Sequence, residues 1–299
     1  MSYPMLPIPA AGEVLLVSTC YEDDRALWDE VLQTLGGYRD GDVLVRADEG
    51  VRLRLVENPR WNSLYGGNFP ALVPAGSRAP VVALADIPAA YGGGAVLLVD
   101  LREIPGRGVR VPTESLDRVL AGLFAGTFRF DELVERMDRY GDFQGDGEEP
   151  ATPTPTAVIR TSFPPLPAIE ATLLVRTDFN GERGWRNLLD GLGELDDENR
   201  TQVDFDSLDE GEVGFEALVV DDREFESLQP GQVPALVPPK ADVTMVALAD
   251  AVTMADPALP LLVVDLYDTP GQAIRIPLAE VGSMAANLEI SNMDFSEFG

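Results

Sequence analysis

The fold is decided by residues 215–277, which contain the apolar runs Ala217-Leu218-Val219-Val220, Thr244-Met245-Val246-Ala247-Leu248-Ala249-Asp250, Leu261-Leu262-Val263-Val264-Asp265-Leu266 and Ile274-Arg275-Ile276-Pro277. Short, continuous apolar runs are typical of strands that are buried on both faces of a sheet. Runs of the same kind occur in the same order between Val51 and Pro112. The chain is therefore an internal duplication.

The two copies agree in sequence as well as in pattern. The segment Pro70-Ala71-Leu72-Val73-Pro74 recurs at residues 234–238, and Val82-Ala83-Leu84-Ala85-Asp86 recurs at residues 246–250. Each copy also has an earlier apolar run, a segment with apolar residues at helical spacing, and a late Pro-Gly turn. Further helices are predicted over residues 113–124 and 278–288. We predict two tandem α/β sandwiches, each with a mixed sheet of about five strands and helices on its faces.

The segment between the copies has a different composition. Residues 138–161 are rich in glycine, proline and acidic residues, and include Pro150-Ala151-Thr152-Pro153-Thr154-Pro155. This composition is typical of an extended linker. We therefore predict one domain over residues 1–137, a linker over 138–161 and a second domain over 162–299. The second copy carries about seven extra residues between its first helix and its second strand.

Composition excludes several classes of function. The chain has 51 acidic and 22 basic residues, a net charge of −29, which argues against direct binding to nucleic-acid phosphates or anionic membranes. It has no histidine, one lysine (Lys240) and one cysteine (Cys20), so histidine-dependent catalysis, histidine metal ligands and an intrachain disulfide are excluded. No cofactor is predicted. With no signal sequence and no apolar run long enough to span a membrane, a cytoplasmic location is expected.

Aspartates follow the apolar strands of both copies. Asp250 and Asp265 end two runs in the second copy, as Asp86 and Asp100 do in the first. Since ligands often bind at the carboxyl ends of strands, Asp250 and Asp265 with Arg275 form a candidate ion site for Mg²⁺-dependent chemistry. The alternative is that these aspartates cap turns and helices, which the lack of a glycine-rich phosphate loop favours.

Arg110 and Arg275 occupy matching positions just after the Pro-Gly turn. Across a hairpin closed by that turn, each arginine is expected to pair with Asp100 or Asp265 of the preceding strand. The alternative is an arginine that binds an anion. Cys20, with no histidine to activate it, is expected to be a small buried thiol.

Acidic charge is concentrated in the second copy. Residues 190–226 contain 15 acidic residues and two arginines, whereas the matching residues 33–62 contain five of each. Residues 161–299 as a whole contain 27 acidic and seven basic residues. A solvated acidic loop is the simpler interpretation. The alternative is a docking surface for the arginine-richer part of the first copy or for a basic partner; the partner-binding residues would be Asp196, Asp197, Glu198, Asp204, Asp206, Asp209, Glu210 and Glu212.

The second copy resembles an uncharacterised bacterial domain family of unknown function that is common in high-G+C bacteria. The resemblance covers most of residues 171–299 and rests on Leu173-Leu174-Val175-Arg176-Thr177-Asp178-Phe179, on residues 261–266 and on Asn287-Leu288-Glu289-Ile290-Ser291-Asn292-Met293-Asp294-Phe295. The first copy is a diverged relative with Cys20 in place of Asp178 and Thr127-Phe128-Arg129-Phe130 in place of residues 292–295. The resemblance implies domain boundaries and no chemistry.

These features favour a non-enzymatic interaction protein whose acidic second copy binds a basic partner protein, in the manner of an immunity protein, an antitoxin or a mimic of a polyanion. One alternative is a Mg²⁺-dependent carboxylate enzyme that acts at the strand ends. Another is a structural scaffold in which the two copies pack against each other as the subunits of a dimer would.

Overall fold

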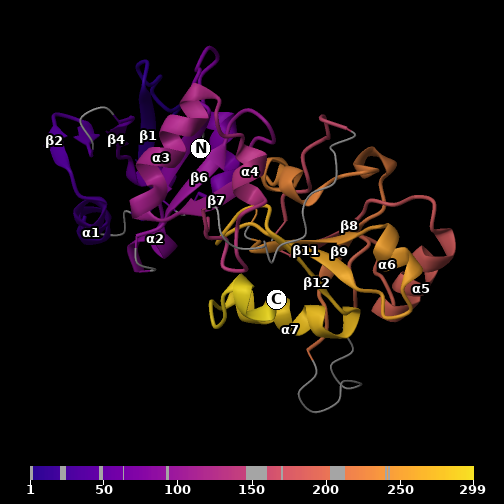
Figure 1. Ribbon diagram of the computed structural model, residues 1–299. Helices are drawn as coiled ribbons and strands as arrows, with labels where there is room; N and C mark the ends of the chain where they lie inside the picture. Colours follow the sequence, from indigo (N-terminus) through magenta and orange to yellow (C-terminus); the bar gives the residue numbers. More distant parts are fainter. Residues whose placement is uncertain are drawn as a thin grey trace. The chain divides into compact units, whose positions relative to one another are not determined.

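The chain forms two compact units, Met1–Thr154 and Pro155–Gly299. The structure, a computed structural model, describes residues 3–20, 25–46, 50–62, 64–91, 94–145, 160–169, 171–202, 213–239, 241 and 243–299. Each unit is built on one mixed sheet with helices, coloured indigo to magenta in the first unit and orange to yellow in most of the second (Figure 1). The predicted α/β class and tandem arrangement are therefore confirmed. None of the described helices has the length and apolar character needed to cross a membrane.

The first unit has a seven-stranded sheet in the order β2-β3-β4-β1-β5-β6-β7. Strand β1 is parallel to β4 and β5, and the other neighbours are antiparallel. The strands are β1 (Glu13–Ser18), β2 (Tyr38–Asp40), β3 (Val43–Val45), β4 (Arg52–Val56), β5 (Val81–Ala85), β6 (Val96–Asp100) and β7 (Gly108–Val111). The helices are α1 (Ala26–Leu35), η1 (Pro59–Trp61), η2 (Gly66–Leu72), α2 (Ile87–Tyr91), α3 (Thr113–Ala125) and α4 (Phe130–Val134).

The second unit has the five strands that the sequence predicts, in the order β12-β11-β10-β8-β9. Strand β8 is parallel to β9 and β10, whereas β11 is antiparallel to β10 and β12. The strands are β8 (Thr172–Arg176), β9 (Ala217–Val220), β10 (Met245–Ala249), β11 (Leu261–Asp265) and β12 (Ala273–Ile276). The helices are α5 (Glu182–Leu192), η3 (Arg223–Phe225), η4 (Pro230–Gln232), η5 (Pro234–Leu236), α6 (Ala251–Ala255), α7 (Leu278–Glu289) and η6 (Phe295–Phe298).

The two additional strands of the first unit form a hairpin that is absent from the predicted pattern. Strands β2 and β3 pair from Tyr38↔Val45 to Asp40↔Val43, which leaves Gly41-Asp42 as a two-residue loop with Gly41 at φ +62°. A two-residue loop of this kind suits the twist of a hairpin. Because all three residues of β2 are exposed, the hairpin has no apolar alternation by which it could be recognised.

Each sheet is covered on both faces. In the second unit, Trp185 and Leu188 of α5 and Met284 of α7 lie in one core with the strands, and Phe225, Leu228 and Val233 lie in a second core. The first unit repeats this arrangement: α1, α3 and α4 share one core, whereas Trp61, Phe69 and Leu72 share the other with the N-terminal segment. Burial on both faces explains why the central strands are continuously apolar rather than alternating.

The first unit extends beyond residue 137, the boundary expected from composition. Met137 and Phe143 form an antiparallel bridge, Arg110 bridges Asp142, and the Phe143 side chain is 2% exposed within the core of the first unit. Residues 138–145, which the sequence assigns to the linker, therefore belong to the first unit. Glycine and acidic residues dominate this segment, so one buried aromatic residue was not recognised as a core residue.

Candidate functional site

Asp250 lies at the carboxyl end of β10 and caps helix α6. Its Oδ1 accepts hydrogen bonds from the backbone N–H groups of Val252 (3.1 Å) and Thr253 (3.0 Å). Arg275 donates through Nη1 to the same oxygen (3.1 Å) and through Nη2 to Oδ2. Burial raises the pKa of this carboxyl, but the hydrogen bonds from Arg275 and Thr253 outweigh burial and hold the pKa below its ordinary value.

The first unit has the same ion pair. Arg110 donates to the two carboxylate oxygens of Asp86 at 3.1 and 2.8 Å, and Asp86 Oδ1 accepts from the N–H of Ala89 (2.9 Å). The expected cross-strand pairs of Arg110 with Asp100 and of Arg275 with Asp265 are therefore not formed. Arg110 lies opposite Leu97 in the ladder, and Arg275 lies opposite Leu262. In each unit the guanidinium pairs with the aspartate that follows β5 or β10.

Asp265 lies at the opposite end of the strands of the second sheet from Asp250. Because β11 is antiparallel to β10, the end of β11 at Asp265 lies opposite Met245, the first residue of β10. Asp250 follows the last residue of β10 and is thus at the opposite end of that strand from Asp265. The structure brings together Asp250 and Arg275 of the candidate ion site and places Asp265 far along the sheet from them. The expected convergence of these three residues requires parallel strands, and β11 is not parallel to β10.

The carboxyl group of Asp265 is almost fully buried. It accepts hydrogen bonds from the N–H groups of Tyr267 (2.8 Å), Asp268 (3.2 Å) and Thr269. Burial, and secondly the neighbouring charge of Asp268, raise its pKa to about 7. This carboxyl group therefore carries a large cost of ionisation in the folded protein.

The first unit surrounds the equivalent aspartate differently. Asp100 accepts from the N–H groups of Arg102 (2.8 Å), Glu103 (3.0 Å) and Ile104 (2.8 Å). The buried Arg107 lies 3.4 Å from Asp100 and 2.7 Å from Asp131. Gln272 and Ser296 occupy the positions of Arg107 and Asp131 in the second unit. The first unit thus pairs its buried aspartate with a guanidinium, and the second unit has an uncharged glutamine at the position of that arginine.

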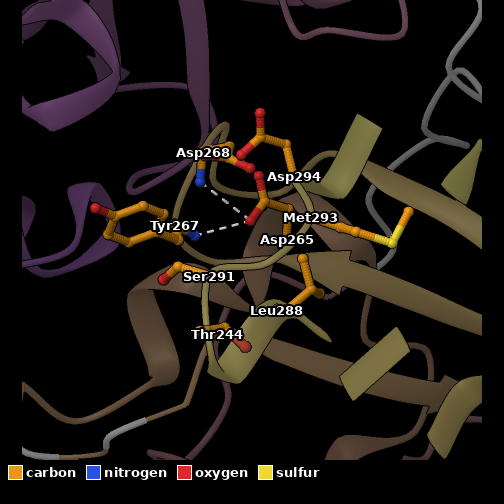
Figure 2. A pocket seen from close by; sticks show the side chains of 8 residues that line it. All are labelled: Thr244, Asp265, Tyr267, Asp268, Leu288, Ser291, Met293 and Asp294. Carbon is orange, nitrogen blue, oxygen red and sulfur yellow. Dashed lines mark hydrogen bonds between the residues drawn. The ribbon is translucent and has the colours of Figure 1, made fainter. Parts of the chain in front are cut away.

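A small pocket opens beside Asp265. Its volume is about 40 Å³, and it is lined by Thr244, Asp265, Tyr267, Asp268, Leu288, Ser291, Met293 and Asp294. Figure 2 shows the three aspartate side chains together at one end of the pocket, with Leu288 and Thr244 at the other. Such a volume suits a water molecule or a small ion and is well below that of ordinary metabolite pockets. In the described part of the chain, no group of three or more cysteine or carboxylate side chains is placed to hold a metal ion.

The described part of the acidic segment lies along the edge strand β9. Asp196 Oδ1 accepts from the N–H groups of Glu198 and Arg200, both at 2.8 Å, which closes a tight turn. Val219 then donates to the carbonyl of Asn199, and Thr201 donates to the carbonyl of Ala217, each at 2.9 Å. The turn therefore holds Asp197 and Glu198 exposed beside β9. The other predicted partner-binding residues, Asp204, Asp206, Asp209, Glu210 and Glu212, lie outside the described residues.

A buried arginine that the sequence patterns do not single out lies at the end of β8. Arg176 is 3% exposed; its guanidinium pairs with Glu182 (2.6 Å) and Asp221 (3.2 Å) and lies over the rings of Phe179 (4.4 Å) and Trp185 (5.0 Å). Trp185 Nε1 also donates to Asp221 (3.0 Å). A charged residue that ends an apolar run is the signal that could have indicated this cluster.

The first unit has a different ion pair at the matching positions. Ser18 replaces Arg176, and Arg25 of the helix region pairs with Glu57 at the end of β4 (2.5 Å). The arginine has thus moved from the strand to the helix between the two copies. An ion pair that exchanges its sides in this way is consistent with a structural role, in which the pairing matters and the position of each charge does not.

Comparison with known proteins identifies the family and no function. A family model described as a domain of unknown function (DUF6924) matches residues 13–146 and again residues 171–299. No curated protein and no solved structure matches the chain. The two matched segments agree with the two copies recognised in the sequence.

Proposed function

We propose that this chain, which belongs to this family of unknown function through two tandem domains, is a non-enzymatic interaction protein. Its acidic second unit binds a basic partner protein. The supporting observation is how the second unit uses its arginines. Arg176, Arg200 and Arg275 all pair with carboxylates of the same unit. Since residues 161–299 contain 27 acidic residues against seven basic ones, most carboxylates of this unit have no basic counterpart within it.

The binding surface that we propose runs along β9, and we call it the acidic edge: Asp197, Glu198, Glu216, Asp221 and Asp222. All five residues are exposed; Glu198 pairs with Arg200 and Asp221 pairs with Arg176, whereas Asp197, Glu216 and Asp222 form no ion pair with the described residues. The hydrogen bonds between the Asp196 turn and β9 hold the turn in place. A fixed array of like charges attracts an oppositely charged partner and raises its association rate. We expect the interaction to take place in the cytoplasm.

The alternative of a Mg²⁺-dependent enzyme has less support. Asp250 accepts hydrogen bonds from Arg275 and from the first turn of α6. Asp265 lies at the opposite end of the strands. Each carboxylate also has an equivalent in the first unit that accepts backbone hydrogen bonds: Asp86 from the N–H of Ala89, and Asp100 from the three N–H groups of residues 102–104. The four strand-end aspartates therefore serve the fold as turn and helix caps.

The proposal is tested by two triple variants with equal changes of charge. Asp197→Asn, Glu198→Gln and Glu216→Gln neutralise the acidic edge, whereas Asp29→Asn, Glu30→Gln and Glu114→Gln neutralise exposed carboxylates of the first unit. The tagged chain is used to isolate a partner from the native cell, and the affinity of the identified partner is then measured with purified proteins. We expect the acidic-edge variant to bind at least tenfold more weakly, the control to bind normally, and the affinity of the wild type to fall as salt rises.

Equal losses in both variants would show that net charge, and not the acidic edge, controls the interaction. A partner that is acidic, or an affinity that does not depend on salt, would overturn the proposal.

A further inference from the structure

The last strand of each sheet, β7 in the first unit and β12 in the second, is an edge strand. An edge strand presents backbone N–H and C=O groups that another chain can pair with, and proteins commonly cover such edges. The two units treat this edge differently.

The first unit covers β7 with its own chain. Arg110 donates its N–H to the carbonyl of Gly141 (2.9 Å) and accepts from the N–H of Phe143 (2.8 Å). These two hydrogen bonds make a parallel bridge between Arg110 and Asp142. The covering segment places Phe143 in the core, and all four residues of β7 are buried.

The second unit leaves the same position uncovered in the described structure. Arg275 pairs with Leu262 in the same register in which Arg110 pairs with Leu97. The backbone N–H and C=O of Arg275 therefore point outward from the sheet, as those of Arg110 do. Among the described residues, the backbone N–H and C=O of Arg275 have no hydrogen-bond partner. The exposed fraction of its side chain is 30%, against 7% for Arg110.

Apolar side chains beside this edge are also less covered than in the first unit. Ile274 is partly exposed where its equivalent Val109 is fully buried, and Phe298 is partly exposed where Leu133 is buried. The chain at Gly299 lies close to the Ile274 side chain, so η6 and β12 adjoin each other at this point. Ile274 and Phe298 thus offer an apolar contact next to two outward-facing backbone groups.

We propose that β12 is a docking edge for an extended segment of a partner protein, which pairs parallel to β12 through two hydrogen bonds to Arg275 and lays one aromatic side chain on Ile274 and Phe298. The covering segment of the first unit is the template for this occupant. The charge of the occupant rests on the function proposed above: Asp294 and Glu297 are exposed on and beside η6, so basic residues flank the aromatic one.

The probe is a capped peptide of residues 139–145 with Asp142→Lys, which carries two positive charges and the aromatic Phe143. It is titrated into the full-length chain labelled with ¹⁵N, and backbone amide shifts are followed. We expect shifts at Ile274, Arg275 and Ile276, and none at β7, because that edge is already occupied. Slower hydrogen exchange at the Arg275 amide is a second readout.

Two modified peptides separate backbone pairing from simple charge attraction. N-methylation at Phe143 removes the N–H that reaches the strand carbonyl, and we expect binding to weaken about tenfold or more. N-methylation at residue 142 is the matched control, because the N–H of Asp142 bonds within its own segment to Asp138 and not to β7. The unsubstituted peptide tests the requirement for positive charge.

The outcomes distinguish the edge from the function. Shifts at residues 194–202 without shifts at β12 would overturn the docking edge and leave the acidic interaction protein standing. Equal binding by the unsubstituted peptide at physiological salt would overturn the charge requirement and retain the docking edge. The proposal would be overturned if millimolar peptide caused no shift, or if the two N-methyl groups weakened binding equally. It would also be overturned if protection of the Arg275 amide from hydrogen exchange rose with protein concentration alone, because a second copy of the chain would then occupy β12.

Discussion

Replacing Asp265 by asparagine is expected to remove a pH dependence of the free energy of unfolding that is confined to the second unit. Its carboxyl pKa changes from 3.8 to about 7 on folding, because the group is buried and lies beside Asp268. Between these values the folded protein retains a proton that the unfolded chain has released, so the free energy of unfolding falls by about 1.4 kcal/mol for each pH unit as pH rises. The full loss is about 4 kcal/mol, of which about 3 kcal/mol falls between pH 5 and pH 8.

Asp265→Asn has no proton to lose in this range. We therefore expect the wild type to exceed the variant in stability at pH 5, since the amide replaces the oxygen that accepts from Thr269, and the difference to shrink by about 3 kcal/mol by pH 8. Above about pH 8, where the folded protein has also released this proton, the difference should become constant. The titratable residues that line the pocket beside the Asp265 carboxyl are Tyr267, Asp268 and Asp294.

Urea unfolding followed by ¹⁹F NMR of 5-fluorotryptophan resolves the two units. Trp28 and Trp61 report on the first unit, and Trp185 reports on the second. A second variant, Gln272→Arg with Ser296→Asp, rebuilds the trio that Arg107 makes in the first unit and is expected to remove the pH dependence by favouring the ionised carboxyl. If wild type and Asp265→Asn keep a constant difference from pH 5 to pH 8 at the Trp185 resonance, the cost assigned to this buried carboxylate is refuted.

Three further substitutions test the structure. Phe143→Ala should destabilise the first unit by about 3–5 kcal/mol, because a large buried side chain is lost, and unfolding at Trp185 should not change; an unaffected first unit would return residues 138–145 to the linker. Gly184→Ala should cost the second unit about 1–3 kcal/mol, since a Cβ there would lie 2.1 Å from the carbonyl oxygen of Met254; wild-type urea midpoints would contradict the close approach of α5 and α6. Arg176→Met should cost about 2 kcal/mol, below the range for a fully buried pair because its carboxylate partners are about half exposed; a more stable variant would show that packing outweighs this ion pair.

Much of the fold follows from local patterns in the sequence. The apolar runs predict the central strands, and the helices expected over residues 113–124 and 278–288 are α3 (Thr113–Ala125) and α7 (Leu278–Glu289). These elements follow from periodicity, proline and glycine, which act within a few residues. The β2–β3 hairpin was missed because its charged outer strand buries nothing.

The candidate site shows the limit of local patterns. The sequence indicates that Asp250 and Asp265 each end a strand, and that Arg275 lies two strands away from β10 along the chain. It does not indicate which strand runs antiparallel, and a single reversal places Asp265 at the other edge of the sheet. The predicted partner of Arg275, Asp265, was wrong for a related reason. The long arginine side chain reaches past the neighbouring strand β11 to Asp250, which follows β10.

The sequence by itself therefore determined that this protein is a duplicated α/β chain, with its acidic charge concentrated in the second copy and no histidine chemistry, because repetition, composition and burial pattern are properties of the chain. Only the tertiary structure decided which carboxylates meet which arginines, that β7 is covered by residues 141–143, and that β12 has no described segment over it. Those features depend on strand direction and on contacts between residues far apart in the chain. Such pairing is set by the packing of the whole unit, and no short window of sequence records it.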